Sequence, residues 1–258
     1  MKKLVSVIVA MGLSAALYAA DEAKEFKGHA ELSYANTAGN TDSQDVAGNL
    51  KLNLPFSSNE IRFVGNALYS DTTSYDENGT YIEDLRTKNR WDAEANYDYN
   101  FNEAIAFNYI LGGKGDEFST FVYQVYTGPG AIVTAVKNDE HHLKFQANVL
   151  YLWDKVREDS ATIPVTSGYM HRYSGYQASM DYIYQFTKNA KFGQYLMYRS
   201  EFEDTTNYFI KSKTYLESKV SDVFSMGMSY TVDYTNNKAA SVRSYTDAVF
   251  LASLIADF

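Results

Sequence analysis

The chain has 258 residues, of which 16% are aromatic and only three are proline, so the composition excludes a disordered or collagen-like protein. The formal net charge is −9, and no basic stripe of the kind that binds phosphate is visible, which argues against nucleic acid as a partner. The sequence contains no cysteine, so disulfides, zinc–thiolate sites, iron–sulfur clusters and cysteine nucleophiles are excluded.

The first twenty residues have the pattern of a secretory signal peptide. Two lysines follow the initial methionine, an apolar run extends from Leu4 to Leu17, and Ala19 and Ala20 precede a charged stretch. The apolar run is shorter than the ~20 residues that a membrane-spanning helix needs. We therefore expect residues 1–20 to be a signal peptide and residues 21–258 to form one exported domain.

Beyond this segment, apolar and polar residues alternate with a period of two. From Thr87 to Phe101 the alternation continues over 15 residues, and such a pattern is typical of a β-strand whose two faces meet different surroundings. The sequence predicts twelve strands of this kind, at residues 26–34, 45–54, 61–70, 88–101, 104–113, 121–134, 141–154, 170–187, 190–203, 208–220, 223–234 and 244–258.

Charged side chains avoid the apolar face of these segments. The other face carries eleven basic and thirteen acidic residues, whereas the apolar face carries only Arg172. If the strands close into a barrel, the charged face lines the lumen. The residues that we expect in this lumen wall are Lys51, Arg62, Lys88, Arg90, Asp92, Glu94, Lys144, Asp181, Arg199, Glu201, Lys211, Lys213 and Glu217.

Strand length and connection length favour a membrane barrel. The segments run from 9 to 18 residues, whereas strands of soluble sandwiches usually have about five or six and a tilted membrane strand needs about nine to eleven. Connections after even-numbered segments have six residues or fewer, and those after odd-numbered segments are mostly longer. This alternation is typical of outer-membrane barrels, and an even strand number leaves both termini in the periplasm.

We therefore predict an all-β fold, a 12-stranded antiparallel up-and-down transmembrane β-barrel. Closure is required because unpaired strand edges cannot face hydrocarbon. The expected location is the outer membrane of a Gram-negative bacterium, with outer-membrane lipid around the barrel and the barrel assembly machinery as a partner during insertion. Phe258 ends the twelfth segment on its apolar phase and resembles the closing-strand signal that this machinery reads.

The first predicted hairpin resembles the start of a known family. Residues 28–43 read GHAELSYANTAGNTDS, and members of the salt-induced outer-membrane protein family, domain of unknown function 481, begin with a similar E-L-S-Y and T-x-G-N-T stretch. The resemblance implies an outer-membrane barrel and an association with salt or osmotic conditions, and it supplies no catalytic residues. Pro129 departs from the strand pattern, and we expect it to mark a bulge or a bent edge.

A catalytic site is not expected. Outer-membrane phospholipases also use twelve strands, but none of the four histidines here is followed two residues later by the serine that such a site needs. His141 and His142 project to opposite faces of one strand and are poor joint metal ligands. Asp92 and Glu94 share a face with two basic residues, which indicates a salt-bridged wall rather than a glycosidase pair. We expect no enzyme activity, no cofactor and no metal.

Two functions remain open from the sequence. Twelve strands enclose an interior narrower than a 16-stranded porin and wider than an eight-stranded barrel filled by side chains. Nearly balanced wall charges favour a narrow, weakly selective pore for small polar solutes or ions, because strong selectivity needs a ring of one sign. The alternative is a non-conducting structural or surface barrel whose charges pair across the lumen. The oligomeric state is left open.

Overall fold

The computed structural model describes residues 26–37, 41–75, 81–117, 121–156, 170–236 and 246–258. No helix in these residues is long and apolar enough to cross a membrane. The strands are β1 (Lys27–Thr37), β2 (Thr41–Phe56), β3 (Asn59–Tyr75), β4 (Tyr81–Asn100), β5 (Ile105–Asp116), β6 (Phe121–Lys137), β7 (His141–Val156), β8 (Met170–Thr187), β9 (Ala190–Glu201), β10 (Tyr208–Lys219), β11 (Phe224–Asn236) and β12 (Thr246–Asp257).

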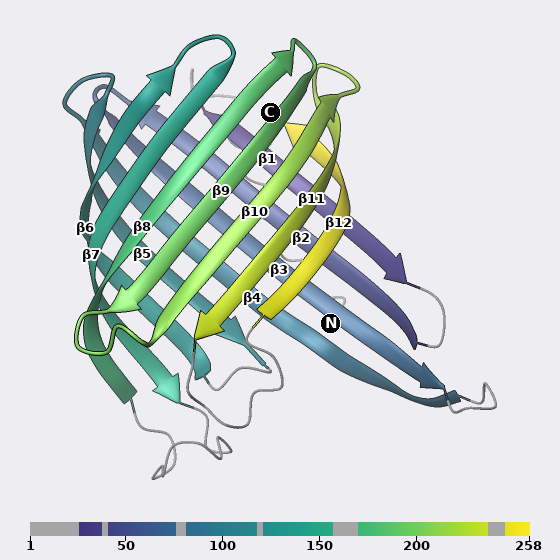
Figure 1. Ribbon diagram of the computed structural model, residues 1–258. Helices are drawn as coiled ribbons and strands as arrows, with labels where there is room; N and C mark the ends of the chain where they lie inside the picture. Colours follow the sequence, from purple (N-terminus) through teal and green to yellow (C-terminus); the bar gives the residue numbers. More distant parts are fainter. Residues whose placement is uncertain (1–25, 38–40, 76–80, 118–120, 157–169, 237–245) are drawn as a thin grey trace.

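The twelve strands form one closed antiparallel barrel, as predicted (Figure 1). Each strand pairs with its neighbours in the chain, and β1 pairs with β12 to close the ring. Gly28 and Phe258 fasten this seam by two backbone hydrogen bonds, in which the N–H of Gly28 donates to the carbonyl of Phe258 at 2.6 Å and the N–H of Phe258 donates back at 3.0 Å. No edge strand remains whose backbone groups are unpaired along its length.

The two ends of the barrel differ. Short turns at residues 57–58, 101–104, 138–140, 188–189 and 220–223 lie at the end where β1 begins and β12 ends. We call this the short-turn end and the opposite end the long-loop end. The predicted alternation holds in part, because the connections at 76–80, 157–169, 202–207 and 237–245 are longer than these turns, whereas those at 38–40 and 117–120 are not. The predicted signal peptide at residues 1–20 lies outside the described residues.

Several strands run further toward the long-loop end than the sequence predicts. β3 continues to Tyr75 and β4 starts at Tyr81, so both project past their neighbours in Figure 1. Residues 70–74 read SDTTS and are polar on both faces. Hydropathy therefore loses its period of two while the backbone ladder continues, with register shifts at Ser70/Asp71 and Ser74/Tyr75.

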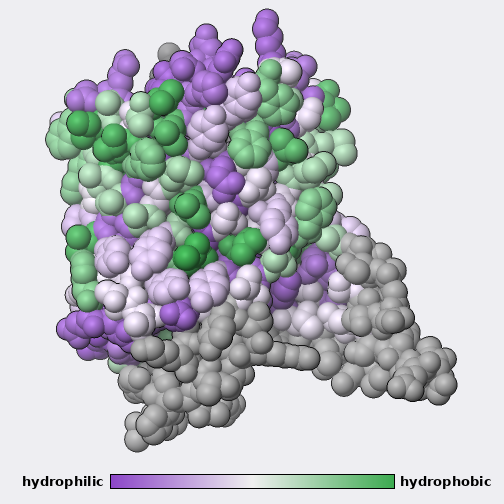
Figure 2. Space-filling model, viewed as in Figure 1, coloured by the Kyte–Doolittle hydropathy of each residue, from purple (hydrophilic) through white to green (hydrophobic). Residues whose placement is uncertain are grey.

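Burial on the barrel is the reverse of that in a water-soluble protein. Along β5, outward residues are exposed and inward residues buried, so Leu111 is 52% exposed while Asn108 is fully buried. Val149 and Phe250 are likewise more than half exposed, and Asp154 is buried. Figure 2 shows hydrophobic side chains gathered on the outer wall below the hydrophilic short-turn end. An apolar surface of this extent is suited to contact with an apolar medium.

The expected bulge at Pro129 is wrong. The β6–β7 register is the same on both sides of this residue, since Thr127 lies opposite Tyr151 and Gly130 opposite Asn148. Pro129 is paired on its other side with Tyr109 of β5. The register shifts of β6 lie nearer its ends, at Phe121/Tyr123 and Thr134/Val136. The missing N–H of proline is thus accommodated without an inserted residue.

Candidate functional site

The lumen is the candidate site, and the structure places all thirteen predicted wall residues on its inward face. This face can be recognised because its side chains meet across the interior. Lys213 of β10 lies 3.4 Å from Glu31 of β1, three strands away around the ring, and only side chains inside a closed barrel can make such a contact. Because directly opposed residues in an antiparallel ladder share a face, the registers extend this assignment to every strand.

Four of the inward residues form a chain of ion pairs across the barrel, which we call the cross-lumen belt. Arg90 of β4 contacts Asp233 of β11 with Nη1 and Oδ2 2.9 Å apart. The Nζ of Lys211 lies 3.7 Å from Asp92 and 3.9 Å from Asp233. Lys211 is on β10 and Asp92 on β4, halfway round the ring of twelve strands. Long basic side chains therefore connect opposite walls.

Two cation–aromatic contacts add to this constriction. The Nζ of Lys114 lies 4.2 Å from the ring centroid of Phe209, which joins β5 to β10. The guanidinium of Arg199 stacks 3.7 Å above the ring of Tyr126 and donates to the Oε1 of Gln177 from Nε and Nη2. Such contacts contribute about 0.5–2 kcal/mol each. The constriction is thus held by ion pairs and aromatic rings together.

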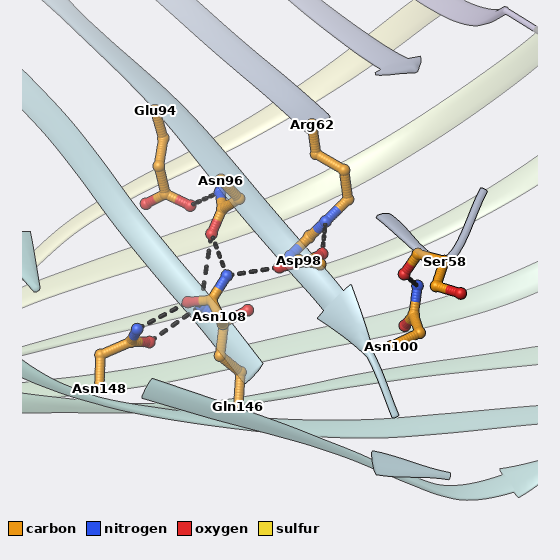
Figure 3. Close-up of polar contacts among 9 residues, drawn as sticks. All are labelled: Ser58, Arg62, Glu94, Asn96, Asp98, Asn100, Asn108, Gln146 and Asn148. Atoms are coloured by element: carbon orange, nitrogen blue, oxygen red, sulfur yellow. Dashed lines mark hydrogen bonds and ion pairs between the residues drawn. The ribbon is translucent and has the colours of Figure 1, made fainter. Parts of the chain in front are cut away.

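A network of amide side chains, drawn in Figure 3, covers one wall on the short-turn side of the belt. Its centre is Asn108 of β5, which donates to Asp98 at 2.5 Å and to Asn96 at 3.1 Å. The Oδ1 of Asn108 accepts from Asn148 at 2.6 Å and from Gln146 at 3.1 Å. Asn96, Asp98, Asn108 and Asn148 are all buried. Since buried polar groups are costly when unpaired, this network fixes the shape of one side of the lumen.

Glycines on the inward face let side chains reach over a neighbouring strand. Gly130 separates Asn108 from Asn148 in the ladder, and a Cβ there would overlap the Asn148 side chain. Gly112 likewise separates Glu94 from Tyr126, whose hydroxyl donates to the carboxylate of Glu94 at 2.9 Å. The ring of Tyr126 occupies the space that a side chain at residue 112 would fill. Glycine placement therefore decides which wall residues meet.

The remaining predicted residues divide into paired and unpaired groups. Arg62 binds Asp98 at 2.6 Å, and Lys191 binds Glu217 at 2.9 Å. Asn207 donates to Glu201 at 3.4 Å. Within the described part of the chain, four predicted wall residues have neither an ion pair within 4 Å nor a side-chain hydrogen bond: Lys51, Lys88, Lys144 and Asp181. Two of these four, Lys144 and Asp181, lie opposite each other in the β7–β8 ladder.

Sequence reasoning missed some of these residues. Lys114 was not expected in the lumen because the fifth segment was predicted to end at residue 113, whereas β5 continues to Asp116. Continuing the segment by one residue would have included it. Asn108 and Tyr126 were missed because they carry no charge, and the lumen face was recognised by its charged residues. No sequence signal marked Phe209, whose partner Lys114 lies on the opposite wall.

The chemistry available in the lumen is ion and dipole contact. The described residues contain no group of three or more His, Cys, Asp or Glu side chains placed to hold a metal ion. On the outer wall, His141 stacks on Tyr184 with the ring centroids 4.8 Å apart and contacts the hydroxyl of Tyr182 at 3.0 Å. The expectation that the chain has no enzyme activity stays a prediction.

Comparison with known proteins agrees with this architecture. A family model described as "Protein of unknown function, DUF481" matches residues 30–258. Among curated proteins none matches. The COG4313 outer membrane channel from Pseudomonas putida F1 is similar with a TM-score of 0.51 and 10% identity, over 90% of this chain and 94% of that one. A NanC porin is similar with a TM-score of 0.46 and 12% identity, over 90% and 98%. At 10% identity, the similarity to the COG4313 channel shows the fold alone.

Proposed function

This chain belongs to the DUF481 family, and from the geometry of its lumen we propose that it forms a narrow, weakly selective pore for small polar solutes or ions. The cross-lumen belt is the observation that carries the proposal. Its two basic and two acidic side chains place both signs of charge at the narrowing, whereas strong selectivity needs a ring of one sign. A salt or osmotic role is a further expectation from the family resemblance.

Water-accessible surface at the belt and on its short-turn side supports a pore. Lys51 points into the lumen and is nevertheless exposed. The belt side chains Arg90 and Lys211 keep 24% and 26% of their surface accessible. A core packed at the density of a protein interior would leave no such surface. The lumen therefore retains accessible surface at Lys51, Arg90 and Lys211, although other inward side chains such as Glu217 and Ser253 are buried.

We place the barrel in the outer membrane of a Gram-negative bacterium. The exposed apolar outer wall and strands of 11 to 20 residues support this location, because a tilted strand of about nine to eleven residues spans the hydrocarbon. By analogy with other barrels, the short turns and both chain ends face the periplasm. Outer-membrane lipid then surrounds the barrel, and the assembly machinery inserts it.

Single-channel recording in planar bilayers tests the pore. The wild-type protein is expected to give small, steady conductance steps in potassium chloride. Replacing the two belt cations, Arg90→Ala with Lys211→Ala, removes the side chains that cross the lumen and should enlarge the steps. A matched control removes an arginine and a lysine from the outer face, Arg172→Ala with Lys155→Ala, and should leave them unchanged. Heat-modifiable gel mobility verifies that each variant is folded.

The second candidate is a non-conducting barrel, and the belt itself favours it. Ion pairs that join opposite walls stiffen a barrel as well as narrowing its lumen. In that case neither the wild type nor the folded belt variant opens in the bilayer. A larger conductance in the belt variant than in the wild type would instead identify the belt as the constriction of a pore.

A further inference from the structure

The outer wall carries one pair of basic residues that the pore does not use. Arg172 is the single charged residue on the apolar faces of the predicted segments, and it lies directly opposite Trp153 in the β7–β8 ladder. β7 continues to Val156, which places Lys155 on the same outward face, two residues beyond Trp153. From this pair we infer that the barrel binds the phosphate group of an anionic membrane lipid, a property that goes beyond the proposed pore.

Aromatic rings show where the pair lies relative to the membrane. Tyr176, Tyr198, Tyr208 and Tyr234 form a row across β8 to β11, with neighbouring ring centroids 5.7 to 5.9 Å apart. Such rings gather at the boundary between hydrocarbon and lipid headgroups. Arg172 lies four residues from Tyr176 toward the long-loop end, which is about 13 Å along a strand that rises about 3.3 Å per residue. Arg172 therefore lies on the headgroup side of the row.

The positive charge of Arg172 is not balanced by the described part of the protein. Its side chain is exposed, and no acidic group among the described residues lies within 4 Å of it. The outward faces of β5 to β12 carry no acidic residue. The neighbouring Asp154 is buried on the inward face, where Gln124 and Tyr173 donate to it. The guanidinium is thus available to an anion from the surrounding membrane.

The geometry of the pair fits a phosphate that carries acyl chains. Arg172 and Lys155 are diagonal neighbours in the ladder, and such positions are about 7–8 Å apart, within reach of long side chains. A guanidinium can bind two phosphate oxygens at once, and an ammonium adds a second positive charge. Toward the short-turn end, the outward face of β7 continues with Tyr151, Val149 and Phe145, which are all exposed. A lipid can therefore place its phosphate between the cations and its chains along β7.

Quenching of tryptophan fluorescence by brominated lipid tests the inference, because one of the two tryptophans of the chain lies at the site. In a Trp91→Phe protein the fluorescence comes from Trp153 alone. The protein is reconstituted in phosphatidylcholine vesicles with a small fraction of phosphatidic acid that is brominated near the headgroup end of its chains. This lipid should quench Trp153 severalfold more than brominated phosphatidylcholine at the same fraction. A Trp153→Phe protein reports instead from Trp91 on β4, three strands from β7, and should show no such preference.

Variants made in the Trp91→Phe protein assign the preference to the pair. Arg172→Gln with Lys155→Gln should remove it, whereas Arg172→Lys keeps both charges and should keep it. Lys188→Gln, in the turn between β8 and β9, should leave it unchanged. Inorganic phosphate in the buffer lacks acyl chains and should not abolish it. Heat-modifiable gel mobility verifies that each variant is folded.

Several results would overturn the inference. Equal quenching of Trp153 by the two lipids means that no phosphate lipid is preferred there. An equal preference at Trp91 assigns it to the whole surface, and a preference that survives both glutamine substitutions assigns it to other groups. Loss of the preference in inorganic phosphate identifies a site for the free ion instead of a lipid. None of these measurements depends on conduction, so a silent barrel refutes the pore and leaves lipid binding in place.

Discussion

Phe258 closes the barrel by lying against Gly28. Two backbone hydrogen bonds join these residues across the β1–β12 seam, and the ring of Phe258 covers the α-carbon of Gly28 so closely that a Cβ there would overlap it. The ring also packs near Phe26, with centroids 6.1 Å apart. The seam thus depends on a glycine in the first strand and an aromatic ring after the last.

Gly28→Ala should weaken this seam. The added methyl group displaces the Phe258 ring from its place beside Phe26, and overpacking of this kind costs about 1–3 kcal/mol. Urea unfolding in lipid vesicles, followed by tryptophan fluorescence, measures the change in the free energy of unfolding. Gly65→Ala is the matched control, because no atom lies within 4 Å of a Cβ at that position. Equal stabilities for the two variants would contradict the role of the seam.

Asn108→Ala should destabilise the barrel through the groups that it leaves unpaired. Asn96, Asp98, Asn148 and Gln146 each lose a partner in a buried part of the lumen, and an unsatisfied buried group costs about 1–3 kcal/mol. The control in the same region is Asn100→Ala, since Asn100 is exposed and donates only to the carbonyl of Ser58. Urea unfolding in lipid vesicles measures the free energy of unfolding of both variants. A decrease for Asn108→Ala no larger than that for Asn100→Ala would show that water replaces the amide.

Leu111→Arg tests whether the outer wall lies in hydrocarbon. Leu111 is 52% exposed in the middle of β5, and an arginine on the lipid face of a barrel near the bilayer midplane costs about 2–4 kcal/mol. Val223→Arg introduces the same charge in the exposed turn between β10 and β11, where a cost of about 0–1 kcal/mol is expected. Comparable, small effects of both variants on unfolding in vesicles would be inconsistent with a transmembrane position for β5.

The strands could be predicted from the sequence because their signal is local. A strand turns successive side chains to opposite faces, so a wall between lipid and water leaves a period of two in the sequence. Asp92 and Glu94 were therefore assigned to the lumen without knowledge of the fold. The period of two did not predict the strand at residues 71–74, because both faces are polar there. It also did not include Lys114, which lies just beyond the clear alternation.

Contacts across the lumen could not be predicted in this way. Lys211 meets Asp92 only because closure places β10 opposite β4 and because the stagger of the registers brings both residues to one height. Asn148 reaches Asn108 only because the residue between them in the ladder is Gly130. These pairings depend on every intervening register.

The sequence by itself determined which face of each strand meets lipid and which meets the lumen, because that choice is written in the alternation of neighbouring residues. Only the tertiary structure decided which inward charges are neutralised and which, such as Lys51, are left unpaired. The physical reason is that ion pairs form at distances of a few ångströms in space, and the closed ring brings together residues that are more than a hundred positions apart in the chain.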